Sequence, residues 1–195
     1  MTDSQPVDPR FFTIGHSTHS LEEFIELLTE NSAEVVVDVR KLPGSNKFPQ
    51  FNADTLVDDL AEAGIRLRRL EGLTGRRPVN HDIDFDVNGW WKNRSFHNYA
   101  DHTLTEEFRH DFDQLLGWGA KSRCVLMCSE AVWWRCHRRI IADNLLAHDF
   151  SVSHIMGKNQ TTAAELSAAA VVDKDENVTY PATDSAISTS KPTDS

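Results

Sequence analysis

The chain has 195 residues with a formal net charge of −10 at pH 7, and 39% of its residues are hydrophobic. This size supports one well-buried core and is too small for two comfortable domains. The acidic balance argues against bulk electrostatic binding to nucleic acid or to an anionic membrane, although a local basic patch can still bind an anion. No apolar run approaches the ~20 residues that a membrane-spanning helix needs, so we expect no membrane partner.

The cysteines are sparse and odd in number: Cys124, Cys128 and Cys136. Together with the lack of a secretory leader, this pattern is typical of reduced thiols in a cytosol rather than of a disulfide framework. We therefore expect a cytoplasmic protein. Residues 1–10 are polar and acidic and are expected to form a flexible N-terminus.

Strand and helix patterns alternate in the first half of the chain. The apolar run Phe11–Ile14 predicts a strand, and the capping box Ser20–Glu23 then opens a helix. The β-branched run Val35–Val39 predicts a strand that is buried on both faces. A second helix is expected to stop at Gly64, and residues 65–70 alternate with period two, as a third strand does.

The second half continues the alternation after a long interruption. Residues 71–102 lack a periodic pattern and predict an irregular stretch, which is a candidate lid. A helix is then expected from Thr103 to near Gly119, and a buried strand over Cys124–Cys128. His137–His148 is predicted to be helical, and residues 151–155 to form a last strand.

This order of elements predicts a single α/β domain over residues 11–157. We expect a mostly parallel, Rossmann-like or flavodoxin-like sheet of about five strands with helices on both faces. From Lys158 onward Ala, Thr, Ser and Asp dominate, and Tyr180 is the only aromatic residue. Such a segment buries too little apolar surface to offset its ordering entropy. Residues 158–195 are therefore expected to form a largely disordered tail, with at most a short helix over 163–172.

Ligands of such folds bind beyond the carboxyl ends of the strands. Four polar clusters follow predicted strands, so we expect them to share one edge of the sheet. The clusters are Gly15-His16-Ser17, Asp38-Val39-Arg40, Gly72 to Arg77, and Cys128-Ser129-Glu130.

A series of short segments along the chain resembles the domain of unknown function 488 family. The resemblance runs from about Phe11 to Gly157 and implies a compact α/β domain, but no established reaction. Two departures stand out: Asn46 and then Lys47 occupy the place of a frequent family arginine, and residues 164–167 lack a frequent family histidine. The segments are Thr13-Ile-Gly-His-Ser17, Val37-Asp-Val-Arg40, Pro43-Gly-Ser45, Pro49-Gln-Phe51, Tyr99-Ala-Asp101, Cys128-Ser-Glu130, Cys136-His-Arg-Arg139 and His154-Ile-Met-Gly157.

The segment from Cys128 to Arg139 is the main candidate for chemistry. A thiol between a buried strand and a helix can be ionised by helix amides and by guanidinium groups such as that of Arg138. Cys128 and Cys136 are therefore candidate nucleophiles, although free cysteines are also common as small core residues. Cys124, in mid-strand, is interpreted as a core residue.

Proton transfer has its own candidates. His16, Glu130 and His137 can exchange protons or orient a substrate, as can Asp38. The alternative is a structural ion pair that holds the loops, such as Asp38 or Glu130 with Arg40 or Arg138.

Substrate contacts are predicted from groups near the same edge. Guanidinium groups suit phosphate and carboxylate ligands, and a tryptophan can stack on a base or simply pin a loop to the core. A metal site of Cys128, Cys136 and His137, completed by His16, is an alternative that we do not favour, because the cysteine spacing lacks the tight pattern of structural zinc. Dinucleotide and Walker motifs are absent. The predicted substrate contacts are Ser17, Arg40, Ser45, Tyr99, Trp134 and Arg138.

Three functions remain open from the sequence. The first is an enzyme that acts on a small anionic, phosphorylated or nucleotide-like substrate. The second is a thiol-dependent enzyme of rhodanese or phosphatase type, ranked lower because Glu130 and two tryptophans intrude on the anion loop that such enzymes use. The third is a nucleic-acid or ligand-binding module, which the acidic net charge disfavours. No cofactor and no oligomeric state are indicated.

Overall fold

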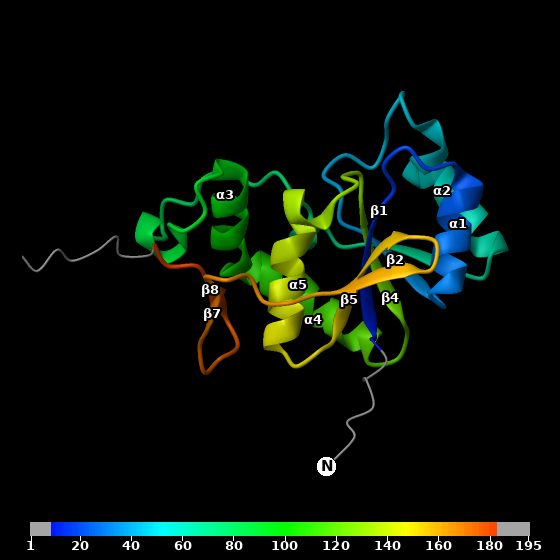
Figure 1. Ribbon diagram of the computed structural model, residues 1–195. Helices are drawn as coiled ribbons and strands as arrows, with labels where there is room; N and C mark the ends of the chain where they lie inside the picture. The colour runs from blue at the N-terminus through cyan, green and yellow to red at the C-terminus, as the bar shows by residue number, and fades with distance from the viewer. Residues whose placement is uncertain (1–8, 183–195) are drawn as a thin grey trace, which may run out of the picture.

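The computed structural model describes residues 9–182, which form three layers with a sheet in the middle (Figure 1). The six strands follow the order β3-β2-β4-β1-β5-β6. All neighbours from β3 to β5 are parallel, and β6 is antiparallel to β5. The predicted mostly parallel α/β fold is confirmed, with one strand more than expected. The strands are β1 (Phe11–Gly15), β2 (Val35–Asp38), β3 (Arg66–Arg69), β4 (Cys124–Cys128), β5 (Val152–Gly157) and β6 (Gln160–Ala163).

Helices cover both faces of the sheet. The helices α1 (Leu21–Glu30) and α2 (Ala53–Glu62) pack on one face. The other face is covered by α3 (Arg94–Thr103), α4 (Glu106–Gly119) and α5 (Arg138–Ala147). Figure 1 shows the two groups on opposite sides of the strands.

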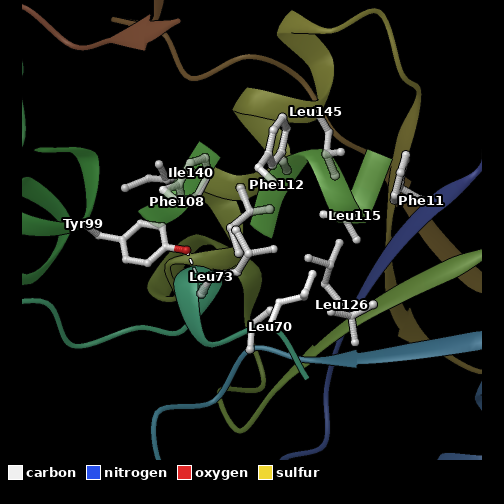
Figure 2. Packing of buried hydrophobic residues seen from close by; sticks show 14 of the residues in the cluster. Phe11, Leu70, Leu73, Tyr99, Phe108, Phe112, Leu115, Leu126, Ile140 and Leu145 are labelled. Carbon is white, nitrogen blue, oxygen red and sulfur yellow. Dashed lines mark hydrogen bonds between the residues drawn. The ribbon is translucent and has the colours of Figure 1, made fainter. Parts of the chain in front are cut away.

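The central strands are apolar along their whole length because they face two cores. Successive residues of β1 alternate between them: Phe11 belongs to the core under α4 and α5, and Phe12 to the core under α1 and α2. Figure 2 shows the first of these cores, where Phe112 and Leu115 of α4 pack near Leu145 of α5. The predicted double burial therefore follows from the position of these strands inside the sheet.

The predicted irregular stretch over residues 71–102 contains a helix that the sequence did not reveal. The helix α3 carries a short apolar stripe of Phe96, Tyr99 and Ala100, but it also buries the polar residues His97 and Asp101, which a sequence pattern assigns to solvent. Tyr99 is also buried, and its hydroxyl donates a 2.6 Å hydrogen bond to the carbonyl oxygen of Leu73 (Figure 2). The stretch is therefore ordered and packed on the core.

The predicted start of a disordered tail at Lys158 is wrong for residues 158–182. This segment adds β6 to the sheet, and the predicted helix over residues 163–172 does not form. Residues 164–182, which we call the C-terminal strap, carry the small hairpin of β7 (Val171–Val172) and β8 (Val178–Thr179). The predicted N-terminal flexibility over residues 1–8 and the tail over residues 183–195 lie outside the described residues.

Tyr180 anchors the C-terminal strap and explains why a polar segment is ordered. Its side chain is completely buried, and its hydroxyl donates a 2.7 Å hydrogen bond to Asp143 Oδ2 of α5. Its amide donates to Asn88 Oδ1 at 3.0 Å, and its ring contacts Trp91 at 5.2 Å between centroids. Burial raises the pKa of Asp143, although the hydrogen bonds from Tyr180 and Ser167 favour its charged form. One buried aromatic residue therefore attaches the C-terminal strap to α5.

Within residues 9–182, no helix combines the length and the apolar character needed to cross a membrane.

The anchoring of the C-terminal strap can be tested with Tyr180→Phe. This substitution keeps the ring but leaves the buried Asp143 without one hydrogen-bond donor, so we expect the free energy of unfolding to fall by about 1–2 kcal/mol. Val171→Ala in the same strap is the control, because Val171 is 52% exposed and its loss should stay within about 0.5 kcal/mol. Urea unfolding measures both. Equal stability of the two variants would contradict the anchoring role of Tyr180.

Candidate active site

The carboxyl ends of β1, β2 and β4 lie side by side because these strands are parallel and adjacent. Backbone hydrogen bonds continue past the strand ends and join the loops. His16 N donates to the carbonyl oxygen of Cys128 at 2.9 Å, and Ser17 N donates to that of Ser129 at 3.2 Å. The segments that were predicted to converge on this edge are therefore directly connected.

Gly15 allows the loop after β4 to cross the end of β1. A Cβ atom at this position would lie 1.8 Å from the carbonyl oxygen of Glu130, which is backbone and cannot rotate away. The close approach of the Gly15 and Glu130 backbones places the loop after β4 over the end of β1. It also directs the Glu130 carbonyl oxygen toward Arg138, whose Nη2 donates to it at 2.7 Å.

Two cysteines meet at the centre of this edge. Cys128 is the last residue of β4, and Cys136 lies just before α5, at the end of the short 3-10 turn Trp133–Arg135. Their Sγ atoms are 2.9 Å apart, and both residues are free thiols that are only 3% and 4% exposed. Cys124 lies at the other end of β4, where burial raises its pKa to about 12. This agrees with its interpretation as a core residue.

The two thiols have opposite tendencies to ionise. Burial opposes the charged form of Cys136, but the hydrogen bond from Cys128 and the nearby His137 and Arg138 outweigh it and hold the pKa of Cys136 well below its usual value. The amide of Arg138 at the start of α5 lies 3.5 Å from Cys136 Sγ, as does His137 Nδ1. Burial and the neighbouring Cys136 raise the pKa of Cys128. These contacts favour Cys136 as the sulfur that ionises first, with the Cys128 thiol as its hydrogen-bond donor.

Arg138 is a buried cation beside this pair. Its side chain is 1% exposed, and it donates to Glu130 O and, at 3.2 Å, to Thr13 Oγ1. Within residues 9–182 no carboxylate lies within 4.0 Å of its guanidinium, and its Nε has no hydrogen-bond partner. Burial disfavours the charge of Arg138, but the sulfur atoms of Cys128 and Cys136 outweigh this and raise its pKa. The two cysteine sulfur atoms are thus the groups whose ionisation would offset the charge of this buried guanidinium.

Thr13 and His154 extend the network beneath Arg138. Thr13 Oγ1 lies 2.7 Å from His154 Nδ1 and also accepts the hydrogen bond from Arg138 Nη1. Burial and the charge of Arg138 lower the pKa of His154 to about 4, so the ring is neutral near pH 7. Trp133 stacks on that ring at 4.3 Å between centroids. Thr13 and His154 were not among the predicted site residues, although each begins a segment that resembles the family and each is a polar residue in a predicted strand.

A cavity of about 320 Å³ opens above the two cysteines. The part of the chain between β3 and α3 forms one of its walls, so the predicted irregular stretch does border the site. Lys41, Arg76 and Arg135 face the cavity without an ion-pair partner among the described residues, against one carboxylate, Glu130. The lining residues are 40–42, 75–76, 93, 95–96, 128–130 and 135–137.

Asp38 and Arg40 form the structural ion pair that was the alternative to catalysis. Arg40 Nε and Nη2 donate to the two carboxylate oxygens of Asp38 at 2.9 and 2.6 Å, and both side chains are buried. Arg40 Nη1 also donates to the carbonyl oxygen of Phe51 at 2.8 Å. Asp38 does not line the cavity, whereas Arg40 does. The pair therefore holds the loop after β2 in place.

His16 lies behind this ion pair. Its ring stacks on Phe51 at 4.2 Å, Nδ1 lies 3.1 Å from the carbonyl oxygen of Ser17, and Nε2 faces Arg40 Nη1 at 3.4 Å. Burial and the charge of Arg40 lower the pKa of His16 to about 4, so it is neutral near pH 7. His16 is not among the cavity residues, unlike His137, whose Nε2 lies 3.0 Å from the carbonyl oxygen of Val39.

Five of the six predicted substrate contacts lie outside the cavity lining, which contains Arg40 of this set. One of the five is the buried Arg138 described above. The hydroxyl of Tyr99 is occupied by Leu73, as described above. Ser17 has a left-handed backbone with φ 47°, and the exposed Ser45 accepts a hydrogen bond from Lys47 N at 3.1 Å within its own loop. Trp134 is 47% exposed beside Trp133. Their roles as substrate contacts stay predictions. Among residues 9–182 no group of three or more His, Cys, Asp or Glu side chains is placed to hold a metal ion.

Residues 20–145 match the family model described as domain of unknown function DUF488. The chain belongs to this family. The match contains both site cysteines and Arg138, whereas Thr13 and His154 lie outside it. No curated protein and no solved structure matches the chain. The function of this DUF488 domain must therefore be inferred from its site.

The crossing of the loop over β1 can be tested with Gly15→Ala. The added methyl group would push the Glu130 carbonyl and the loop away, and we expect the free energy of unfolding to fall by about 1–3 kcal/mol. The matched control is Gly117→Ala in α4, where an added Cβ meets nothing within 4 Å and helix propensity favours alanine by up to about 1 kcal/mol. Urea unfolding compares the two. The close approach would be refuted by a Gly15→Ala protein as stable as Gly117→Ala.

Proposed function

We propose that this DUF488 protein is a thiol-dependent enzyme that acts on a small anionic substrate, with Cys136 as its nucleophile. The observation that carries the proposal is the position of Cys136. Its sulfur lies beside the Cys128 thiol and next to the backbone amide of the buried Arg138, and the residue lines the cavity. A lowered thiol pKa in an accessible, electropositive site is what distinguishes a reactive cysteine from a core cysteine.

The residues that counted against a thiol enzyme in the sequence do not obstruct the sulfur. Glu130 is exposed, and it is its backbone carbonyl, not its carboxylate, that Arg138 contacts. Trp133 stacks on His154, away from the cavity lining. The geometry therefore favours thiol chemistry more than the sequence did.

The preference for an anion rests on the charges around the cavity. The positive charges of Lys41, Arg76 and Arg135 outnumber the single negative charge of Glu130 in the cavity lining. The cavity volume of about 320 Å³ suits a small molecule rather than a polymer. Guanidinium groups bind carboxylates and phosphates well. The local charge is thus opposite in sign to the net charge of −10.

The reaction follows from the state of the two sulfur atoms. The Cys136 thiolate donates its electron pair to an electrophilic atom of the substrate, and the leaving group departs with the electrons of the broken bond. His137 and the amide of Arg138 orient the sulfur, and the Cys128 thiol is the nearest proton donor. Arg138 stabilises the thiolate before the attack.

Two alkylating reagents of the same size test the proposal. Iodoacetate is an anion and iodoacetamide is neutral, so the ratio of their rates at Cys136 reports the potential of the cavity. We expect Cys136 to be alkylated fastest of the three cysteines, and the iodoacetate-to-iodoacetamide ratio to exceed that of the urea-unfolded chain. Arg135→Gln should lower the ratio about two- to fivefold, as expected for one nearby charge. Site-resolved mass spectrometry measures each rate.

Arg109→Gln is the matched control, because Arg109 is exposed on α4 and does not line the cavity. It removes the same charge and should leave the ratio unchanged. If Cys136 reacts no faster than it does in the unfolded chain, or if the anionic reagent has no advantage in the folded protein, the proposal is wrong.

A further inference from the structure

The sulfur atoms of Cys128 and Cys136 are close enough to form a disulfide bond after a small movement. Cys128 Sγ lies 2.9 Å from Cys136 Sγ, whereas a disulfide has about 2.05 Å, so closure of the bond requires a movement of roughly 1 Å. Cys128 is at the end of β4 and Cys136 precedes α5, so both come from backbone that the sheet and the helix hold in place. Both line the same cavity.

We propose that Cys128 is a resolving thiol and that the site carries out thiol–disulfide exchange with small anionic thiols and disulfides. This inference rests on the proposed function, because it keeps Cys136 as the attacking group and the basic cavity as the binding site. It adds a substrate class and a second reacting residue. Cys136 is placed to attack first, because it is the sulfur that His137 and the α5 amide contact.

The exchange balances in two steps. In the first, the Cys136 thiolate attacks one sulfur of the substrate disulfide, the substrate S–S bond breaks, and one substrate thiolate leaves with its electron pair. In the second, Cys128 gives up its proton and attacks Cys136 Sγ, the mixed disulfide breaks, and the second substrate half leaves. One released half carries the proton of Cys128, the substrate has gained two electrons, and the protein has lost two electrons and holds a Cys128–Cys136 disulfide. An external small thiol reverses both steps.

Arg138 determines which side of this equilibrium the protein favours. When the disulfide forms, the Cys136 thiolate disappears and the buried guanidinium loses a neighbouring countercharge. An uncompensated buried charge is costly, so the dithiol form is stabilised relative to the disulfide form. The Cys128–Cys136 disulfide should therefore be reduced more easily than a structural disulfide.

The experiment uses two small disulfides of similar size: dithiodiglycolate, which carries two carboxylates, and 2-hydroxyethyl disulfide, which is neutral. With dithiodiglycolate the full-length wild-type protein should lose two hydrogen atoms without keeping an adduct, and peptide mapping should link Cys128 to Cys136. Cys128→Ser should retain a mixed disulfide on Cys136, and Cys136→Ser should form neither product. Cys124→Ser is the control and should behave as the wild type.

The ratio of the dithiodiglycolate rate to the 2-hydroxyethyl disulfide rate should also be several-fold higher in the folded protein than in the urea-unfolded chain. A wild-type protein that keeps its adduct as Cys128→Ser does would overturn the resolving role of Cys128. An equal relative rate for the two disulfides would overturn the anionic substrate class. In both cases, rapid alkylation of Cys136 by iodoacetate would leave the proposed function intact. Loss of that alkylation would instead refute the proposed function itself.

Discussion

The charge of Arg138 is the constraint around which the site is built. A guanidinium that is 1% exposed must find its hydrogen bonds and its countercharge inside the protein. Thr13 and the Glu130 carbonyl supply hydrogen bonds, and in the proposed function the Cys136 thiolate supplies the charge. Removing one partner of such a pair costs about 3–5 kcal/mol in other proteins, because the remaining charge stays buried. Structure and reactivity therefore depend on the same contact.

This contact also explains the placement of the surrounding elements. Strand β1 provides Thr13 and then Gly15, whose missing side chain lets the loop after β4 present its carbonyl to Arg138. Strand β5 provides His154, which stays neutral beside the cation and is hydrogen-bonded to Thr13 Oγ1. The C-terminal strap holds the other side of α5 through Tyr180 and Asp143. The helix that begins at Arg138 is thus held on two sides.

The sequence predicted the sheet and the edge where the site lies, because strand periodicity and the ends of parallel strands follow directly from local patterns. It could not separate the roles of the residues at that edge. Asp38 and Arg40 look as reactive in sequence as Cys136 does, and only their mutual hydrogen bonds identify them as a loop-holding pair. The helix α3 escaped prediction because most of its residues are polar and several of these are buried by tertiary contacts. The C-terminal strap escaped prediction because tertiary contacts, not apolar periodicity, order it. In α3, the polar residue His97 is buried and its ring contacts Phe85 from outside the helix. In the C-terminal strap, Tyr180 is a single aromatic residue in a polar segment.

A titration of thiolate absorbance in the ultraviolet against pH tests the central claim most directly, since it measures the charge that is assigned to Cys136. The account predicts that one thiolate of the native protein titrates well below ~8.5, the pKa of an unperturbed thiol. This early transition should be absent in Cys136→Ser and unchanged in Cys124→Ser. Two results would contradict the assignment of this charge to Cys136. One is thiolate absorbance that rises only at or above a pH of about 8.5 in the native protein, and the other is an early transition that survives in Cys136→Ser.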